Sequence, residues 1–438
     1  MSRTLIDLIR DGDLEAVRRC LVAAPRWDEW AEDDLAEVRD LLFVMRWESP
    51  REDDLRAFGA EVLRHAGPGF AELLFGGGKV SFHLGLAPSG PWGDIDPVVW
   101  AADHGTPLLL TELLINPVPA ATLRHALEAA RAWFDTDPEA ELRRRLGVDA
   151  GTVERDVVVG GEYLPGAPRI RLTAPDGRWS EVLIAHRAIA TRLEENLGLP
   201  VSRAELLARA RWSADPDRWD WSEASARMSR QFSPAENVAW AVSRLADPDV
   251  LVRRFTAEML HTLAFDEDGP PISAMLAALP ARLAVEPDPW TMENLVAAYG
   301  NAGPAGEVLH ELLPYARDPR PAVRARVAAH LLNHVADPPP DVLDVVLGLA
   351  HDPDPEVRLA ATATLAREPV DTPALRELLA THLAGDDHRL RIEAATGLAF
   401  RGDANALGAL RRLSDEDGAG SHAWWSYDNA ERLFAGRG

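Results

Sequence analysis

Four arginines stand close together in the C-terminal half of the chain, where their charge could bind an acidic ligand. They are Arg317, Arg320, Arg324 and Arg326, and the acidic residue that opposes them in the sequence is Asp318. A guanidinium presents its N–H donors in a planar fork that matches a carboxylate or a phosphate. The chain as a whole has 46 Lys+Arg against 70 Asp+Glu and a net charge of -24. We therefore expect this basic cluster to be the place where an acidic ligand would bind.

Two histidines, His330 and His334, follow four residues apart in the same segment. This spacing puts both rings on one face of a helix, as in many zinc sites. The sequence fixes no third ligand, although Asp337 is near. We predict that the two histidines line a binding groove or surface, and we predict no metal site.

Tryptophan is abundant, with 14 in the chain, and Trp212, Trp219 and Trp221 stand close together. Tryptophans can cover the ends of a helical array, or they can form the energetic centre of a protein interface. Both interpretations stay open. In the second, Trp219 and Trp221 are candidate binding residues.

Motifs for catalysis are missing from the sequence. The segment Gly76 to Lys79 resembles the end of a phosphate loop, but Leu73 and Val80 replace the first glycine and the hydroxyl residue that the loop requires. The single cysteine, Cys20, is predicted to be a small buried side chain. We predict no catalytic residue and no cofactor, and an enzyme is the less favoured class.

Composition excludes several functions. A surface this acidic repels nucleic acid, and no apolar run reaches the length of a membrane span. The first ten residues carry charges and lack the apolar core of a signal peptide. We expect a monomeric, cytoplasmic protein with a protein partner, and with no nucleic-acid or membrane partner.

A short motif recurs along the C-terminal half and points to a repeat architecture. In each copy an aliphatic residue is followed by arginine, then by small residues, then by leucine at the eighth step, which places one apolar stripe on a helix. The aligned copies begin at Val252, Val323, Val357 and Leu390, with a weaker copy at Thr291. Asp-Pro precedes three copies by five residues, at Asp247, Asp318 and Asp352. We expect these aspartates to cap the helices, with the prolines in the first helical position.

This pattern resembles the HEAT repeat family, over roughly residues 201 to 438. The resemblance implies antiparallel helix pairs stacked into a superhelix, whose second helices line a concave face. It also implies that the repeated arginines pair with aspartates of the neighbouring unit. Anion binding is the alternative to that structural role, and the arginines concerned are Arg253, Arg324, Arg358 and Arg391.

The N-terminal part resembles the ankyrin repeat family in two places. One lies between Leu5 and Leu21, and the other begins at Asp96-Pro97 and continues through Ala101-Ala102 to Gly105. The full ankyrin signature is absent, and a divergent helical array remains an alternative. Helices are also expected at Asp34 to Arg46 and Glu52 to His65.

Between the two helical parts the hydrophobic period changes. Apolar and polar residues alternate at Val153 to Val159 and at Arg169 to Thr173, and a turn at Ala174 to Gly177 precedes Trp179. This pattern predicts a β-hairpin. The predicted fold is mostly α: an ankyrin-like helical region at 1–147, a small α/β connector at 148–200, and a HEAT-like α-solenoid at 201–438.

The favoured function is a non-catalytic scaffold that binds a protein on the concave solenoid surface, since repeat arrays offer extended surfaces of this kind. The alternatives are a lyase-like accessory enzyme of the bacterial HEAT-repeat type, and an acidic decoy that occupies a basic surface of a partner.

Overall fold

The computed structural model describes residues 15–16, 18–19, 52–76, 92, 94–160, 164–265, 272–304, 306–332, 335 and 337–435. The chain divides into two compact units, Met1–Gln231 and Phe232–Gly438, which we call the first and the second unit. The finer division into regions 1–147, 148–200 and 201–438 stays a prediction.

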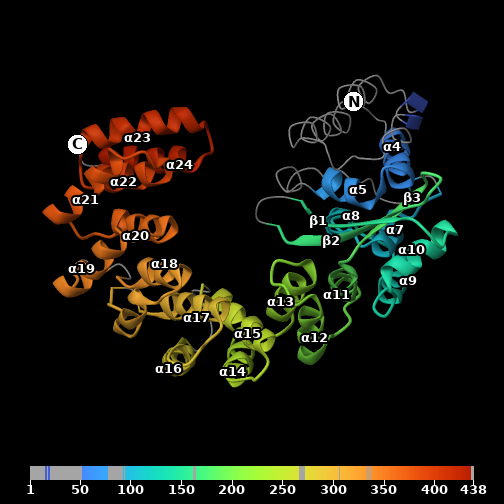
Figure 1. Ribbon diagram of the computed structural model, residues 1–438, viewed down its shortest axis with the longest axis horizontal. Coiled ribbons are helices and arrows are strands. Elements are labelled where there is room, and N and C mark those ends of the chain that lie inside the picture. The colour runs from blue at the N-terminus through green and yellow to red at the C-terminus, as the bar shows by residue number, and fades with distance from the viewer. Residues whose placement is uncertain are drawn as a thin grey trace. The chain divides into compact units, whose positions relative to one another are not determined.

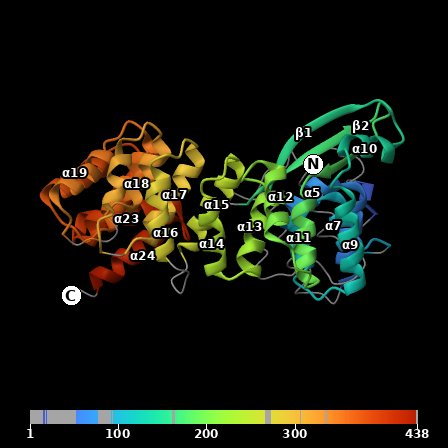
Figure 2. The same cartoon turned by 90° about the horizontal axis from the view of Figure 1, so that it is seen from below.

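The first unit combines helices with one small sheet (Figure 1). Its described elements, in chain order, are α4 (Glu52–His65), α5 (Gly67–Gly76), α7 (Pro97–His104), α8 (Pro107–Leu113), α9 (Ala120–Ala132), α10 (Pro138–Leu146), β1 (Thr152–Val159), β2 (Gly166–Thr173), β3 (Trp179–Leu183), α11 (His186–Asn196), α12 (Arg203–Ser213) and α13 (Trp219–Gln231). Helices α7, α9 and α11 pack side by side, with the sheet and α10 at one end of them (Figure 2). Helix α4 confirms the helix predicted from Glu52 to His65.

The sheet confirms the predicted hairpin and extends it to three antiparallel strands in the order β1-β2-β3. Successive side chains of a strand point to opposite faces. On one face Leu172 and Val182 join Leu142 of α10 in a hydrophobic cluster. On the other face, next to α5, Ala167 and Leu183 join Val158 in a second cluster.

The face of the sheet beside α5 also carries buried charge. Arg171 Nε donates to Glu181 Oε2 at 2.7 Å, and the Gly69 amide of α5 donates to Glu181 Oε1 at 2.8 Å. A buried carboxylate needs such donors to offset its lost hydration. The Glu181 carboxylate therefore joins α5 to the sheet.

Helices α7 and α8 form a short pair within the second ankyrin-like segment. Asp96 accepts hydrogen bonds from the Val98 and Val99 amides, and Pro97 takes the first helical position. Gly105 ends α7 with φ 75°, a conformation that favours glycine. The other ankyrin-like segment, at Leu5 to Leu21, falls almost wholly outside the described residues, as do the predicted helix from Asp34 to Arg46 and Cys20.

The second unit is a stack of helical hairpins. Its described helices are α14 (Pro234–Arg244), α15 (Val250–Leu263), α16 (Ile272–Leu283), α17 (Pro289–Ala302), the 3₁₀ helix η2 (His310–Arg317), α18 (Pro321–His330), α19 (Pro340–Leu349), α20 (Pro355–Arg367), α21 (Pro373–Leu383), α22 (His388–Phe400), α23 (Ala404–Asp417) and α24 (His422–Ala435). Each second helix packs on the second helix of the next hairpin, from α15 through α17, α18, α20 and α22. These five helices, the inner layer, lie on the inner side of the curved row within this unit, with α14, α16, α19 and α21 outside (Figure 1). The predicted α-solenoid is confirmed.

Apolar positions of the motif form the core, as the period predicts. Val323, Val327 and Leu331 are completely buried. One first helix, His310–Arg317, is a 3₁₀ helix and not a regular α-helix. Pro314 inside it lacks the N–H that a regular helix would use.

The predicted helix caps are wrong by two residues. The N-caps of α15, α18 and α20 are Asp249, Arg320 and Asp354, each two residues after the aspartate of an Asp-Pro pair. In α20 the Asp352 side chain accepts instead from the Asp354 amide, at 2.9 Å. Aspartate favours this turn, in which it bonds the backbone two residues on. This turn leaves the rest of the carboxylate available to another repeat.

Candidate functional site

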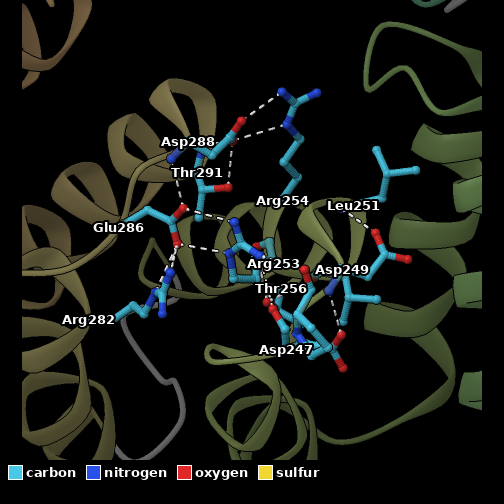
Figure 3. Close-up of polar contacts among 12 residues, drawn as sticks. Asp247, Asp249, Leu251, Arg253, Arg254, Thr256, Arg282, Glu286, Asp288 and Thr291 are labelled. Atoms are coloured by element: carbon cyan, nitrogen blue, oxygen red, sulfur yellow. Dashed lines mark hydrogen bonds and ion pairs between the residues drawn. The ribbon is translucent and has the colours of Figure 1, made fainter.

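The repeated arginines of the inner layer contact carboxylates of the following repeat in two places. We call them the arginine ladder, which comprises Arg253, Arg324, Arg358 and Arg391. In α15, Arg253 Nε and Nη2 donate to the two carboxylate oxygens of Glu286 at 3.1 and 3.3 Å (Figure 3). Arg282 Nε donates to the same carboxylate at 2.8 Å, and the Glu286 side chain is fully buried. Two guanidinium groups thus surround one buried carboxylate.

A second pair joins the same two helices nearer to solvent. Arg254 Nε and Nη2 donate to Asp288 at 3.0 and 2.8 Å, and the Thr291 amide donates to Asp288 at 2.9 Å (Figure 3). Burial by itself would raise the pKa of Asp288, but the hydrogen bonds from Arg254 and Thr291 outweigh it and lower the pKa to about 2. Asp288 is therefore ionised at neutral pH.

Two arginines of the predicted basic cluster are neutralised by carboxylates. Arg320 Nε and Nη2 donate to Asp318, both at 2.7 Å. Arg324 Nε and Nη2 donate to Asp352 of the next repeat, both at 2.8 Å. A new anion would have to compete with these bidentate pairs.

The other two arginines of the cluster, Arg317 and Arg326, are exposed on different helices, η2 and α18. Arg326 is close enough to act on buried groups of the inner layer. Burial raises the pKa of Glu293, and the charges of Arg326 and Arg320 oppose that rise. The four arginines thus lie on different elements, and Arg326 and Arg320 both act on Glu293 of the inner layer.

A group of polar side chains crosses α15, α17 and α18, and we call it the inner patch. Its members are His261, Glu293, Asn294, Arg326 and His330. His261 Nδ1 and Asn294 Oδ1 are 3.2 Å apart, which links the first two helices. Burial lowers the pKa of His261, the hydrogen bond with Asn294 opposes this, and the charge of Arg326 adds to it. The inner patch thus carries neutral imidazole groups beside one guanidinium.

His330 lies against α17, where Gly300 leaves room for its ring. A Cβ at Gly300 would come within 2.2 Å of the His330 ring. Burial lowers the pKa of His330 to about 4, and the charges of Arg326 and His261 add to this effect. His334, the other predicted histidine, lies outside the described residues.

The two predicted tryptophans belong to the first unit. Trp221 is completely buried. Trp219 is half-buried and packs against the hydrophobic cluster that contains Ala167 and Leu183. Trp219 thus contributes to the core beside the sheet, and the burial of Trp221 leaves it out of a partner's reach.

The first unit contains a cavity of about 550 Å³ between α4, α7 and the β2–β3 turn. Its ionisable lining residues are Arg64, His65, His104, Asp176, Arg178 and Glu181. Each of them already has a partner: Arg64 pairs with Asp94, His65 with Glu61, Arg178 with Asp176, Glu181 with Arg171, and His104 with the Trp100 carbonyl. The ionisable groups that line this cavity are therefore already paired within the chain.

The inner patch includes three residues that the sequence reasoning missed, namely His261, Glu293 and Asn294. Their signal is positional, because they stand on the face of the second helices opposite the buried stripe. Charge along the sequence instead predicts Arg317, Arg320, Arg324 and Arg326. Among the described residues, no cluster of three His, Cys, Asp or Glu side chains could hold a metal ion, and no helix is long and apolar enough to cross a bilayer.

Comparison with known proteins supports the repeat assignment. Residues 307–399 match the HEAT repeats family, which confirms the resemblance in that range. No curated protein sequence matches the chain.

Solved structures with a similar course of helices share little sequence with the chain. An Escherichia coli protein, YibA, has 16% identity over 48% of this chain and 75% of its own, with a TM-score of 0.38. An engineered protein has 12% identity over 99% of this chain and 98% of its own, with a TM-score of 0.28. The karyopherin Kap121p, bound to the extreme C-terminus of the protein phosphatase Cdc14p, has 11% identity over 96% of this chain and 46% of its own, with a TM-score of 0.31.

Proposed function

We propose that the protein is a non-catalytic scaffold that binds a protein partner on the inner layer of the second unit. The observation that carries this proposal is the inner patch. Its polar groups span three successive repeats, and they are not consumed by the arginine ladder, which already holds the repeats together. A surface built across repeats suits a partner larger than a small molecule.

The chemistry of the inner patch favours binding over catalysis. Its histidines have pKa values below their usual range, as burial is the largest influence on both. They are therefore neutral at physiological pH and can donate and accept hydrogen bonds. Arg326 adds an exposed guanidinium, a group enriched at protein interfaces. The lyase-like enzyme and the acidic decoy stay alternative predictions.

A photocrosslinking experiment tests the proposal. A photoreactive amino acid replaces either Arg326 in the inner patch or Arg317 on η2, both of which are exposed arginines only nine positions apart. In native cells we expect the probe at 326 to capture one defined protein that the probe at 317 does not capture. Equal capture at both positions, or none at 326, would reject the inner patch as the binding surface.

A further inference from the structure

One interface of the arginine ladder shows how the second unit binds a carboxylate between repeats. Asp352 receives three N–H donors: Nε and Nη2 of Arg324, both at 2.8 Å, and the Asp354 amide at 2.9 Å. The arginine comes from one repeat and the amide from the start of the next second helix. Together they form a three-donor anion pocket, which Asp352 fills from within the chain.

The same pocket occurs at the interface between α15 and α17. Glu286 receives Arg253 Nε and Nη2 at 3.1 and 3.3 Å, and the Asp288 amide at 2.9 Å. In both cases the carboxylate stands two residues before the N-cap of the following second helix. The geometry is therefore a repeated feature, and it accepts either aspartate or glutamate.

Arg358 on α20 provides the arginine for the next interface, and the backbone orients it as in the preceding repeat. Its Nη1 donates to the Asp352 and Pro353 carbonyls, both at 2.9 Å. Arg324 Nη1 donates to the two corresponding carbonyls of its own repeat, at 2.8 and 3.3 Å. In Arg324 this arrangement leaves Nε and Nη2 to bind the following repeat, and Arg358 has the same two carbonyl contacts.

At the position of the carboxylate this interface has Gly385, which carries no side chain. Gly385 stands two residues before Asp387, the N-cap of α22, as Asp352 stands before its own N-cap. The Gly385 amide donates to the His382 carbonyl at 3.1 Å, the same bond that Asp352 makes to Leu349 at 3.0 Å. The backbone thus follows the same course at both interfaces, with glycine at the position of the acidic residue.

A left-handed backbone does not explain this glycine, because Gly385 is not among the glycines with positive φ. A Cβ built there would lie 3.3 Å from the His382 carbonyl oxygen, a close contact that a shift of a few tenths of an ångström relieves. Within the described ranges, no side chain accepts from Nε or Nη2 of Arg358 or from the Asp387 amide. Gly385 itself is exposed, so a group from outside the chain can reach these donors.

We propose that Arg358 Nε and Nη2, together with the Asp387 amide, bind an acidic side chain of the protein partner. This inference rests on the proposed scaffold function and adds a carboxylate anchor to it. A carboxylate is the ligand that the same donors hold at two other interfaces of this unit. Charge-assisted bidentate bonds of this kind are among the stronger hydrogen bonds in proteins.

Fluorescence polarisation with a labelled hexaglutamate peptide tests the anchor, with hexaglutamine as the uncharged probe. We expect Arg358→Gln to weaken hexaglutamate binding about tenfold, because it removes a charge-assisted pair. Arg391→Gln is the matched control. It removes an equal charge from the next position of the ladder, where no carbonyl or carboxylate of the described residues orients the arginine side chain. Equal weakening by both variants would overturn the proposal in favour of general electrostatic attraction.

Gly385→Asp provides the decisive variant, since it restores the internal carboxylate. We expect it to abolish hexaglutamate binding and also to raise the melting temperature, and we expect Arg358→Gln to cancel that increase in the double variant. Unchanged peptide binding in Gly385→Asp would reject the pocket. Inorganic phosphate is added as a competitor, and displacement of the peptide at equal concentration would identify a site for free anions instead of a partner side chain.

These outcomes are independent of the photocrosslinking at Arg326. Loss of crosslinking with intact hexaglutamate binding would reject the inner patch and leave the carboxylate pocket. The reverse result would reject the pocket and leave the scaffold.

Discussion

Three buried acidic side chains of the first unit have different surroundings from two acidic side chains of the second unit, although Glu181 and Glu194 of the first unit also pair with arginines. In the first unit, burial raises the pKa of Glu72 to about 8, of Glu112 to about 7 and of Asp220 to about 7. In the second unit, Glu286 lies between two guanidinium groups, and Asp288 has its pKa lowered to about 2. The first group of acids is held by backbone amides or by burial, while the second is held by arginines of an adjoining helix.

The difference follows from periodicity. A repeat places an arginine and a carboxylate at fixed positions, so that a cation of one repeat meets an acid of the next. In the first unit the Glu72 carboxylate accepts instead from the Leu108 and Leu109 amides at the start of α8. Such amides stabilise a carboxylate without offsetting its whole charge. The comparison therefore predicts that the two units respond differently to mutation and to pH.

The largest effect is expected for Val323→Asp. Val323 is completely buried between repeats, and an unpaired charge there should destabilise the second unit by about 4 kcal/mol or more. Ala322→Asp, at the exposed neighbouring position, is the matched control. Urea unfolding followed by hydrogen exchange should show loss of protection in the second unit only. Similar losses for both variants would contradict the assigned helix face.

The second-largest loss of stability is expected from removing the Glu286 carboxylate, which Arg253 and Arg282 share. Glu286→Gln leaves Arg253 and Arg282 close together and without their common acid, which should cost about 3 kcal/mol. The control is Glu356→Gln, which breaks an exposed pair with Arg389 and should leave the urea midpoint unchanged. A midpoint for Glu286→Gln that matches this control would show that the buried network adds nothing to stability.

The third prediction concerns pH and the first unit. Because folding raises the pKa of Glu72 from 4.5 to about 8, its contribution to stability is complete below pH 4.5 and is lost as the pH rises through about 8. The slope should reach about 1.4 kcal/mol per pH unit within this window. Glu72→Gln should reduce the slope, and Glu128→Gln, at an exposed helical position, should not. The experiment is urea unfolding across that pH range, and an unaltered slope in Glu72→Gln would assign the dependence to other groups.

The smallest effect is expected for Arg324→Ala. Its pair with Asp352 is partly accessible to solvent, so the loss should be about 1 kcal/mol. The measurement is the urea midpoint of the second unit, compared directly with that of Val323→Asp. A loss as large as that of its buried neighbour would mean that the ladder, and not the apolar stripe, holds the repeats together.

The apolar part of the fold could be predicted from the sequence because it depends on local periodicity. The aliphatic position of each motif predicts a buried stripe, and Val323 and Val357 are both completely buried. The alternation around Arg169 likewise predicts a strand, because period two is also a local property. The neighbouring-unit acid that the HEAT resemblance implies is present for Arg324, as Asp352.

The candidate site was less predictable because its residues depend on packing between repeats. Clustering of charge in the sequence grouped Arg317 with Arg326, whereas the structure places them on different helices. The His330 ring packs against Gly300 of the preceding repeat, where a Cβ would clash with it, and no local pattern links the two residues. The Asp-Pro pairs predict helix caps at their aspartates. Local sequence does not distinguish a capping aspartate from one that forms a turn two residues before the cap, as Asp352 does.

The glycine between α7 and α8 has a mechanical consequence for the first unit. A Cβ on Gly105 would come within 1.8 Å of the Leu183 carbonyl oxygen, so the turn touches the backbone of β3 directly. Any side chain at this position would act as a wedge between the helical pair and the sheet. With glycine there, the two can transmit force to each other through backbone contact. A force applied to the β-hairpin should therefore reach α7 and α8 before the packing of side chains is disrupted.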